Sequence, residues 1–419
     1  MAQAAMFCFW VLFGLVVGQT LLVLGFVRAL RGRMRSGSEP SYTPQTAVIL
    51  CLRGTDPFLS ECLDGLLQQD FPHYAVWIVI DQPDDPAWGV VREALTRHPA
   101  VPVQVLSLTE RRETCSLKCS SLTQAVALLD ASYEVVALLD ADTVPHRMWL
   151  RELVAPLADS QVGAATGNRW YMPAEPSWGS LVRYTWNSAA IVQMYWYSIP
   201  WGGALAVRTA VFRQSNLLER WRSAFCEDTM LYRVLREIGF RVAFAPSLMM
   251  VNREACDLPG CLGWVRRQLL TARLYHPGWP AVVVHGVATA AAQAVWLALL
   301  LAAGTARHWS AVAWLVAGGA CYWSSMAVLL GLLELGVRQV VHRRGEPVQW
   351  LKLRFVVRLL VAIPWTQVVY PLALLSAMLL RRVEWRGAVY RVDGPWHIRL
   401  IEDRPAEARR AAGQSGRSL

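Results

Sequence analysis

Two aspartates separated by one residue, Asp140 and Asp142, could take part in chemistry. They follow the apolar run 135–139, which predicts a buried strand of a parallel sheet. Open α/β sheets bind ligands at the carboxyl ends of their strands, and carboxylate oxygens suit Mg²⁺ or Mn²⁺, which can bridge substrate phosphates. The pattern predicts a divalent-cation site at these two residues. The alternative is a strand end with two solvated acids.

A second acidic pair, Glu227 and Asp228, stands directly before the helical run Thr229–Glu237. A carboxylate at this place could act as a general base that takes the proton from an acceptor hydroxyl. It could also do no more than cap the helix, which is worth about 1 kcal/mol.

Two further positions could contact a nucleotide. Asp81 closes the predicted strand 74–80, and Asp84 follows it, so that either acid could accept a hydrogen bond from a base N–H or a ribose hydroxyl. The alternative is that these acids only form a turn around Pro83. Lys118 precedes the predicted helix 121–129 and could neutralise a diphosphate, or could be an ordinary surface lysine.

Gly202 and Gly203 form a turn of small residues after Trp201. Glycine lets the backbone approach a ligand closely, because it has no Cβ. A plain turn between two strands is the alternative.

Alternating strands and helices must position these residues. The sequence predicts strands over 47–52, 74–80, 103–106 and up to residue 140, separated by helices over 58–70, 88–97 and 121–129. This alternation indicates βαβ units and a parallel sheet. A nucleotide site is therefore expected at the ends of the first, second and fourth strands, within a soluble domain over residues 36–255.

The composition places the rest of the chain in or on a membrane. Hydrophobic residues make up 54% of the sequence and charged residues 17%, which departs from globular averages. The segment 1–35 holds an apolar run long enough to cross a bilayer and no cleavage site, so it predicts a retained anchor. Arg28 and Arg31 follow that run, and the positive-inside rule then puts the soluble domain in the cytoplasm.

Four more segments follow the soluble domain. Residues 256–280 predict an amphipathic helix on the membrane surface, and residues 281–337 a transmembrane hairpin. Residues 338–392 hold a basic loop and an apolar segment, 355–380, with two prolines. Because a single crossing there would leave a basic tail outside, a re-entrant or kinked segment is preferred. Residues 393–419 read as a polar, disordered tail. The chain is thus expected to be a multi-pass integral membrane protein.

The net charge of +10 is concentrated beside the apolar runs. This distribution suits anionic lipid headgroups better than a nucleic acid. The nine cysteines lack the spacing of zinc ligands, which favours packing thiols in a reducing compartment.

Several motifs in a fixed order carry a family resemblance. They are Ile80-Asp81-Gln82-Pro83-Asp84-Asp85-Pro86-Ala87, the Asp140/Asp142 pair, the Gly202-Gly203 turn, Glu227-Asp228, and the tail Trp385-Arg386-Gly387-Ala388-Val389-Tyr390. The set resembles family 2-type glycosyltransferases and, more narrowly, ceramide glucosyltransferases and their bacterial relatives. The resemblance implies a GT-A-type, Rossmann-like α/β domain inserted between an N-terminal transmembrane helix and C-terminal membrane helices.

The resemblance also implies a reaction and roles for its residues. A hexose, with glucose as the first choice, would pass with inversion from a UDP-sugar donor to a hydroxyl of a lipid acceptor such as a ceramide-like lipid or diacylglycerol. Asp84 or Asp81 would contact the nucleotide, Asp140 and Asp142 would hold the nucleotide and Mg²⁺ or Mn²⁺, and Asp228 would be the base, supported by Glu227.

A later motif of the family, Gln or Arg followed after two residues by Arg-Trp, is incomplete here. Gln268 has the place of the first residue, but Thr271 and Ala272 stand where Arg-Trp is expected. Arg273 or Arg267 could replace the missing charge, or this helix could contact lipid headgroups instead.

Two other functions fit part of the pattern. A processive polysaccharide synthase would share the domain but would need the intact Arg-Trp motif and usually more spans. A transporter or membrane scaffold without catalysis would not need a soluble domain of this size. The sequence does not indicate an oligomeric state.

Overall fold

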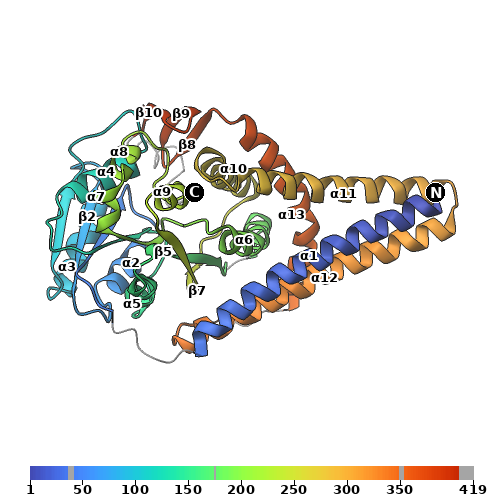
Figure 1. Ribbon diagram of the computed structural model, residues 1–419, viewed down its shortest axis with the longest axis horizontal. Helices are drawn as coiled ribbons and strands as arrows, with labels where there is room; N and C mark the ends of the chain where they lie inside the picture. The colour runs from blue at the N-terminus through green and yellow to red at the C-terminus, as the bar shows by residue number, and fades with distance from the viewer. Residues whose placement is uncertain (36–41, 174–175, 349–352, 405–419) are drawn as a thin grey trace.

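The computed structural model describes residues 1–35, 42–173, 176–348 and 353–404. Figure 1 shows a sheet domain, made of a large sheet with helices on both faces, from which long helices extend in one direction. Two helices, α6 (Trp178–Tyr197) and α10 (Leu258–Tyr275), lie between the sheet and the long helices.

The large sheet has seven strands in the order β3-β2-β1-β4-β6-β5-β7. The strands are β1 (Thr46–Leu52), β2 (Tyr74–Ile80), β3 (Val103–Ser107), β4 (Val135–Leu139), β5 (Val162–Tyr171), β6 (Ala204–Arg208) and β7 (Arg241–Asn252). All five residues of β4 are buried, as expected for a central strand covered on both faces. The chain order reverses between β1 and β4, and such switch points are where open sheets form ligand crevices.

Helices cover the sheet on both faces. One hydrophobic core joins the sheet to α2 (Leu59–Leu66), α3 (Ala87–Arg97) and α5 (Trp149–Val154), the last of which continues into the 3₁₀ turn Ala155–Ala158. A second core joins the opposite face to α4 (Leu117–Ala127), α7 (Thr209–Gln214), α8 (Leu217–Trp221) and α9 (Leu231–Glu237). The site-bearing ends of the central strands are therefore held by two packed layers.

The sheet is mixed. The prediction of parallel βαβ units is confirmed for β1 to β4, and the prediction did not extend to β6. This strand runs antiparallel to both β4 and β5, with Ala204 opposite Leu139. Because β6 is reversed, its first residue lies beside the last residue of β4, which brings the preceding Gly202-Gly203 turn next to Asp140.

Helix α4 begins one turn before its predicted start at residue 121. The side chain of Ser116 caps it by accepting a hydrogen bond from the amide of Cys119 over 3.1 Å. Lys118 thus lies in the first turn of the helix and not in the loop before it.

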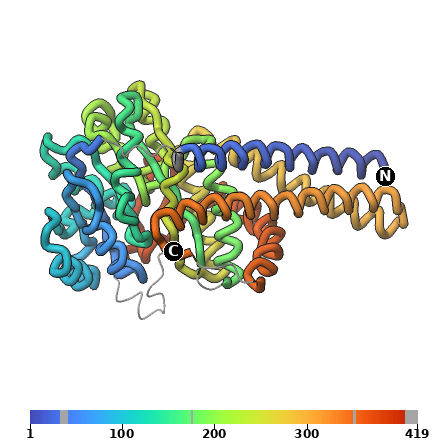
Figure 2. The backbone as a smooth tube through the Cα atoms, turned by 90° about the horizontal axis from the view of Figure 1, so that it is seen from below, coloured from blue at the N-terminus to red at the C-terminus, as the bar shows by residue number. Residues whose placement is uncertain are grey.

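Four helices in the described part of the chain are long and apolar enough to cross a membrane. They are α1 (Ala2–Arg35), α11 (Trp279–Thr305), α12 (Trp309–Arg343) and α13 (Leu353–Leu379). Figures 1 and 2 both show α1, α11 and α12 running side by side away from the sheet domain.

Helix α13 runs across the direction of the other three at the base of the sheet domain (Figure 1). Near its start, Arg358 donates to the carbonyl of Pro176 over 3.4 Å. At its end, Arg273 of α10 donates to the carbonyls of Ala377 and Leu380 over 2.7 and 2.9 Å. Both ends of α13 therefore contact the sheet domain, and the helix continues through both of its prolines.

A three-stranded antiparallel sheet follows, made of β8 (Arg382–Trp385), β9 (Ala388–Gly394) and β10 (His397–Asp403). It packs on α4, where the hydroxyl of Tyr390 accepts a hydrogen bond from the amide of Leu117 over 3.1 Å. The expectation of a disordered tail from residue 393 is wrong as far as Asp403, because Ile398 is buried in the second core. Residues 405–419 lie outside the described part.

Helix α10 also differs from expectation. Instead of lying on a surface with one free face, it is buried or half-buried from Trp264 to Tyr275 between α6 and α13. The mixture of tryptophan, leucine and arginine that suggested a membrane surface belongs to an internal wall, which faces the candidate site.

Candidate active site

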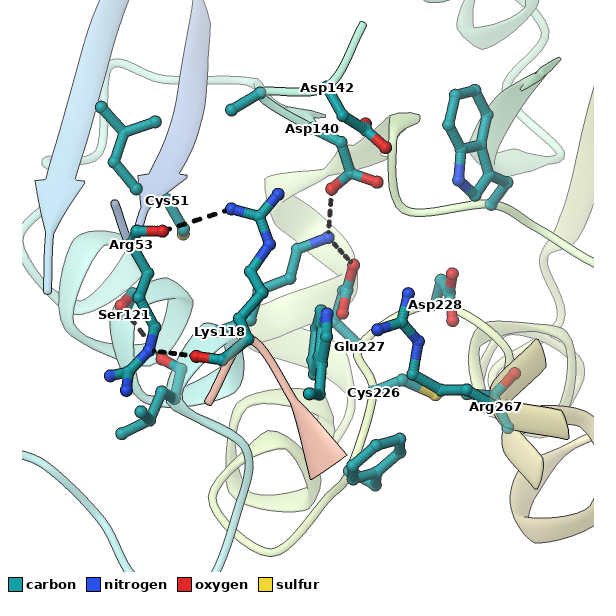
Figure 3. Close-up of a pocket in the computed structure, with 18 of the residues that line it drawn as sticks. Cys51, Arg53, Lys118, Ser121, Asp140, Asp142, Cys226, Glu227, Asp228 and Arg267 are labelled. Carbon is teal, nitrogen blue, oxygen red and sulfur yellow. Dashed lines mark hydrogen bonds and ion pairs between the residues drawn. The ribbon is translucent and has the colours of Figure 1, made fainter. Parts of the chain in front are cut away.

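A pocket opens at the carboxyl ends of β1, β2 and β4, where the sequence placed a nucleotide site (Figure 3). Its cavity volume of about 140 Å³ is far larger than the voids of a packed interior. It is lined by Arg53, Asp81, Lys118, Asp140, Asp142, Arg169, Trp201, Glu227, Asp228, Arg267, Gln268, Thr271, Trp385, Arg386 and Tyr390, among others. The structure thus brings together acids that are up to 147 positions apart in the sequence (81 to 228).

Lys118 joins the two acidic motifs. Its ammonium group lies 2.6 Å from Oδ1 of Asp140 and 2.6 Å from Oε1 of Glu227, as the dashed lines in Figure 3 mark. Burial alone would raise the pKa of Asp140, but the adjacent Lys118 ammonium holds that pKa below its usual value. Burial raises the pKa of Glu227 to about 7, although Lys118 opposes the shift. The lysine therefore stabilises negative charge mainly on Asp140.

Asp142 is paired on one side only. Its Oδ2 lies 2.9 Å from Arg169, whereas its buried Oδ1 has no hydrogen-bond partner within the described residues. Burial raises the pKa of Asp142 to about 6, against the opposing effect of Arg169. In the described part of the chain, one carboxylate oxygen thus stands buried in the pocket without a hydrogen-bond donor.

Backbone amides hold Asp228 in place. Gly202 donates to its Oδ2 over 2.8 Å and Thr229 to its Oδ1 over 2.6 Å. Burial raises its pKa above the usual range, although Lys118 and the two amides act in the opposite direction. A Cβ on Gly202 would overlap the Glu227 carboxylate, and one on Gly203 would lie 2.7 Å from Oδ2 of Asp140. This close approach explains the two glycines.

The two acids after β2 differ from each other. Asp81 lines the pocket, where it pairs with Arg53 and, over 2.7 Å, with Arg111. Asp84 is exposed and is not among the residues that line this pocket. Of the two positions considered for nucleotide contact, only Asp81 is at the site.

The residues of the incomplete motif on α10 also lie in different places. Arg267 and Gln268 line the pocket, and the Arg267 guanidinium lies 5.1 Å from the centre of the Trp385 ring. Arg273 caps the end of α13 instead, so it does not supply the charge that the motif lacks.

The C-terminal sheet supplies a cation that the sequence analysis did not assign to the site. Arg386 stands between β8 and β9 with a φ of +51°, followed by Gly387 at +74°, so the pair forms a tight hairpin turn. Its guanidinium makes two hydrogen bonds to Asp56, of 2.7 and 2.9 Å, and lines the pocket. The Arg-Gly pair between two short strand-like runs was the available signal.

Arg53 and Arg169 were missed as well. Arg53 directly follows β1, as Asp81 follows β2, so its place at a strand end could have indicated it. Arg169 lies within β5 and is held over the rings of Trp201 and Trp264, 4.9 and 5.5 Å from their centres. No local pattern in the sequence marks that second arginine.

The comparisons with known proteins agree with this geometry. The sequence profile of glycosyl transferase family 21 matches residues 10–396. The chain belongs to glycosyl transferase family 21. A family 21 protein is a glycosyltransferase that uses a nucleotide sugar, so the charged pocket at the strand ends is the expected place for that donor.

Solved structures resemble this family 21 chain in fold. A mannosyltransferase from Pyrobaculum calidifontis, solved with GDP-Man and Mn²⁺, is 22% identical, covers 79% of this chain and 98% of its own, and gives a TM-score of 0.50. A glucosyl-3-phosphoglycerate synthase from Mycobacterium tuberculosis, solved with Mn²⁺, UDP-glucose and glycerol 3-phosphate, is 13% identical over 54% and 78% of the two chains, with a TM-score of 0.35. The first match confirms the predicted GT-A fold, and the second is only a distant likeness.

The acids of this family 21 site suit a divalent cation. Within the described residues no three acids, histidines or cysteines cluster closely enough to form a complete ligand set. The buried, unpartnered Oδ1 of Asp142 and the neighbouring carboxylate of Asp140 nevertheless provide hard oxygen ligands, and substrate phosphates or water complete the shell of Mg²⁺ in many such sites. The residues present therefore fit the cation that the sequence predicted.

Proposed function

We propose that this protein is a membrane-bound inverting glycosyltransferase that moves glucose from UDP-glucose to the hydroxyl of a membrane lipid. A ceramide-like lipid is the first choice of acceptor, with diacylglycerol as the next. One observation carries the proposal: Asp228 lines both the charged pocket and a second, mostly apolar cavity beside it. A carboxylate at that junction can reach a sugar donor on one side and a lipid hydroxyl on the other.

The apolar cavity has the composition expected for an acceptor site. Besides Asp228 it is lined by Trp186, Ile191, Met194, Ile199, Trp264 and Leu269, among other residues. Apolar walls with a few placed polar groups are typical of sites for small amphiphilic molecules. The four long apolar helices would anchor the protein in the membrane, which is the source of a lipid acceptor.

Asp228 would act as the general base. Its carboxylate takes the proton of the acceptor hydroxyl while the hydroxyl oxygen attacks the anomeric carbon from the face opposite the nucleotide. The new glycosidic C–O bond forms as the bond to the diphosphate oxygen breaks, and UDP leaves with the bonding electrons. Direct displacement of this kind inverts the anomeric configuration.

The basic residues of the pocket would stabilise the departing diphosphate. Arg386 and Arg267 line the pocket on the side of the C-terminal sheet and α10, where they would supply fixed positive charge close to the diphosphate. Asp140 and Asp142 would hold Mg²⁺ or Mn²⁺, which when bound neutralises charge on the diphosphate. Lys118 would keep Asp140 ionised for that purpose.

The proposed membrane arrangement places the site in the cytoplasm. Arg28 and Arg31 near the end of α1, and Arg343 at the end of α12, mark the cytoplasmic side by the positive-inside rule. Helix α13 would lie in the membrane without crossing it, since both of its ends contact the sheet domain. This arrangement keeps the C-terminal sheet on the same side as the pocket that it helps to form.

The test is transfer from labelled nucleotide sugars to lipid in a detergent preparation of the full chain. We expect UDP-glucose to label one glycolipid in the organic extract, with ceramide and diacylglycerol offered separately as acceptors. An Asp140→Asn/Asp142→Asn preparation is the control. A labelled polymer would indicate a polysaccharide synthase instead, and failure of every donor to label any product would contradict the proposal.

A further inference from the structure

We infer that a channel leads from Asp228 to a cavity among the long helices, and that this cavity binds the hydrocarbon chain of the acceptor lipid. The inference rests on the proposed function and adds the place and the chemistry of acceptor recognition. It begins with a third cavity, of about 140 Å³, which is lined by residues of α1, α6, α10, α11, α12 and α13.

The three cavities follow one another in space, and each neighbouring pair has lining residues in common. The charged pocket and the apolar cavity beside it share Asp228, Gln268 and Trp201. That apolar cavity and the one among the long helices share Trp186, Ala190 and Gln193 of α6, together with Leu269 and Val282. The three residues of α6 are spaced by four and three positions, so they lie along one face of the helix. This face forms a wall common to the apolar cavity beside the site and the cavity among the long helices.

The cavity among the long helices, called the far cavity below, has apolar walls where a hydrocarbon chain would lie. Its walls include Leu22 and Val23 of α1, Met326 and Leu330 of α12, and Ile363 of α13. These helices also expose apolar residues outward, such as Val287, Leu335 and Leu372, so lipid is the medium that they fit. A cavity lined by such helices, which shares lining residues with the apolar cavity beside the site, is matched in polarity to a hydrocarbon chain and not to a sugar or a nucleotide.

A polar group stands where the two apolar cavities meet. The side chain of Gln193 lines both cavities and makes no hydrogen bond within the described residues. A little deeper, Nε2 of Gln19 and Nε2 of His285 lie 3.2 Å apart in the wall of the far cavity. A primary amide with free donors and acceptors can bind the amide or ester group that joins a lipid chain to its hydroxyl-bearing head. The occupant is therefore a lipid whose polar linkage lies close to the reacting hydroxyl.

Ala190 is the residue at which this channel can be blocked without touching the charged pocket. It is small and half-buried, and it lines both apolar cavities but not the charged pocket. In Ala190→Phe the larger side chain would occupy the passage. Ala291→Phe is the matched control, because Ala291 is exposed on α11 and lines none of the three cavities.

The experiment measures transfer from UDP-glucose to an acceptor series with increasing chain length, using the full chain in detergent. In the wild type, kcat/KM should rise with chain length until the cavity is filled. In Ala190→Phe that rise should be lost, with a decrease of about tenfold or more for long chains, as expected when two or three methylene groups lose their burial. The affinity of Ala190→Phe for UDP-glucose should equal that of the wild type, and Ala291→Phe should behave as the wild type in both assays.

A second measurement on the unmodified chain protects the test against a misfolded variant. An acceptor analogue with a photoactivatable diazirine near the chain end should label peptides of α6 and α12, and excess unlabelled acceptor should prevent the labelling. Undiminished long-chain transfer by Ala190→Phe, or labelling confined to other helices, would overturn the channel. If the wild type transfers glucose to no lipid at all, the proposed function itself fails, which is a distinct result.

Discussion

The backbone amide of Gly202 donates a hydrogen bond to Oδ2 of Asp228 over 2.8 Å. The two residues are 26 positions apart, and the reversed strand β6 brings them together. The bond orients the carboxylate that the proposed mechanism uses as its base, and it requires a residue without a Cβ at position 202, because Glu227 fills the adjacent space.

Gly202→Ala should abolish transfer while the chain still folds. The added methyl group would overlap the Glu227 carboxylate and displace it, at a cost of about 1–3 kcal/mol in the free energy of unfolding. Transfer assays and thermal unfolding measure the two effects. Gly263→Ala on α10 is the matched control, because a Cβ there meets no atom within 4 Å and should leave activity unchanged. Wild-type activity in Gly202→Ala would contradict the geometry described for Asp228.

Arg386→Ala should weaken donor binding more than it slows the chemical step. The guanidinium lines the pocket and would lose a charge-assisted contact to the diphosphate, which corresponds to a KM for UDP-glucose raised by about 10- to 100-fold. Steady-state kinetics separate KM from kcat, and Arg386→Lys should recover part of the affinity. Arg382→Ala on the neighbouring strand is the control, since that side chain is 62% exposed. An unchanged KM in Arg386→Ala would exclude the assigned role.

On the acid side, kcat/KM for transfer should begin to fall at a higher pH than the usual pKa of a carboxylate would predict. Burial raises the pKa of Asp228 and raises that of Glu227 to about 7, whereas free carboxylates titrate near ~4. A base works only when ionised, so a raised pKa means that kcat/KM increases with pH through this range and then levels off. A pH profile of kcat/KM checks whether the inflection lies above about 4, the usual pKa of a carboxylate. An inflection at or below that value would contradict the assignment.

Chelation should stop the reaction reversibly. EDTA is expected to lower transfer by at least about a hundredfold, because charge on the diphosphate then lacks its counter-ion, and Mn²⁺ or Mg²⁺ should restore it. Restoration should fail in Asp142→Asn, because Oδ1 of Asp142 is the buried carboxylate oxygen that has no hydrogen-bond partner among the described residues. Asp159→Asn, at an exposed ion pair, is the control and should be restored as the wild type. Full activity in EDTA would exclude a required cation.

The sequence predicted the parts of this site that depend on local pattern. Asp81 and Asp140 follow short apolar runs that predicted buried strands, and the carboxyl ends of neighbouring parallel strands meet at one edge. The hydrophobicity of a short segment and the period of its apolar residues can be read from the sequence. These two properties were sufficient to place the acids at strand ends. The resemblance to family 2-type glycosyltransferases, carried by the order of the motifs, implied the GT-A fold, and the structural match supports it.

The missed features depend on contacts between distant segments. Arg386 reaches the pocket only because the C-terminal sheet packs on α4, through Tyr390 and Leu117, which are 273 positions apart. The direction of β6 depends likewise on pairing with β4 and β5, which no periodicity encodes. Arg273 was considered for the site from its spacing on α10, yet the end of α13 provides the carbonyl groups that it binds. Tertiary packing decided all three.

The account depends most on Asp228 as the base that activates a lipid hydroxyl, and Asp228→Asn tests it most directly. The measurement is single-turnover transfer from UDP-glucose to the identified lipid, with UDP-glucose binding measured on the same preparation. Asparagine keeps the size of the side chain but cannot take the proton, so we expect normal donor binding and a rate lower by about 10²- to 10⁴-fold. Transfer at the wild-type rate would contradict the proposed mechanism.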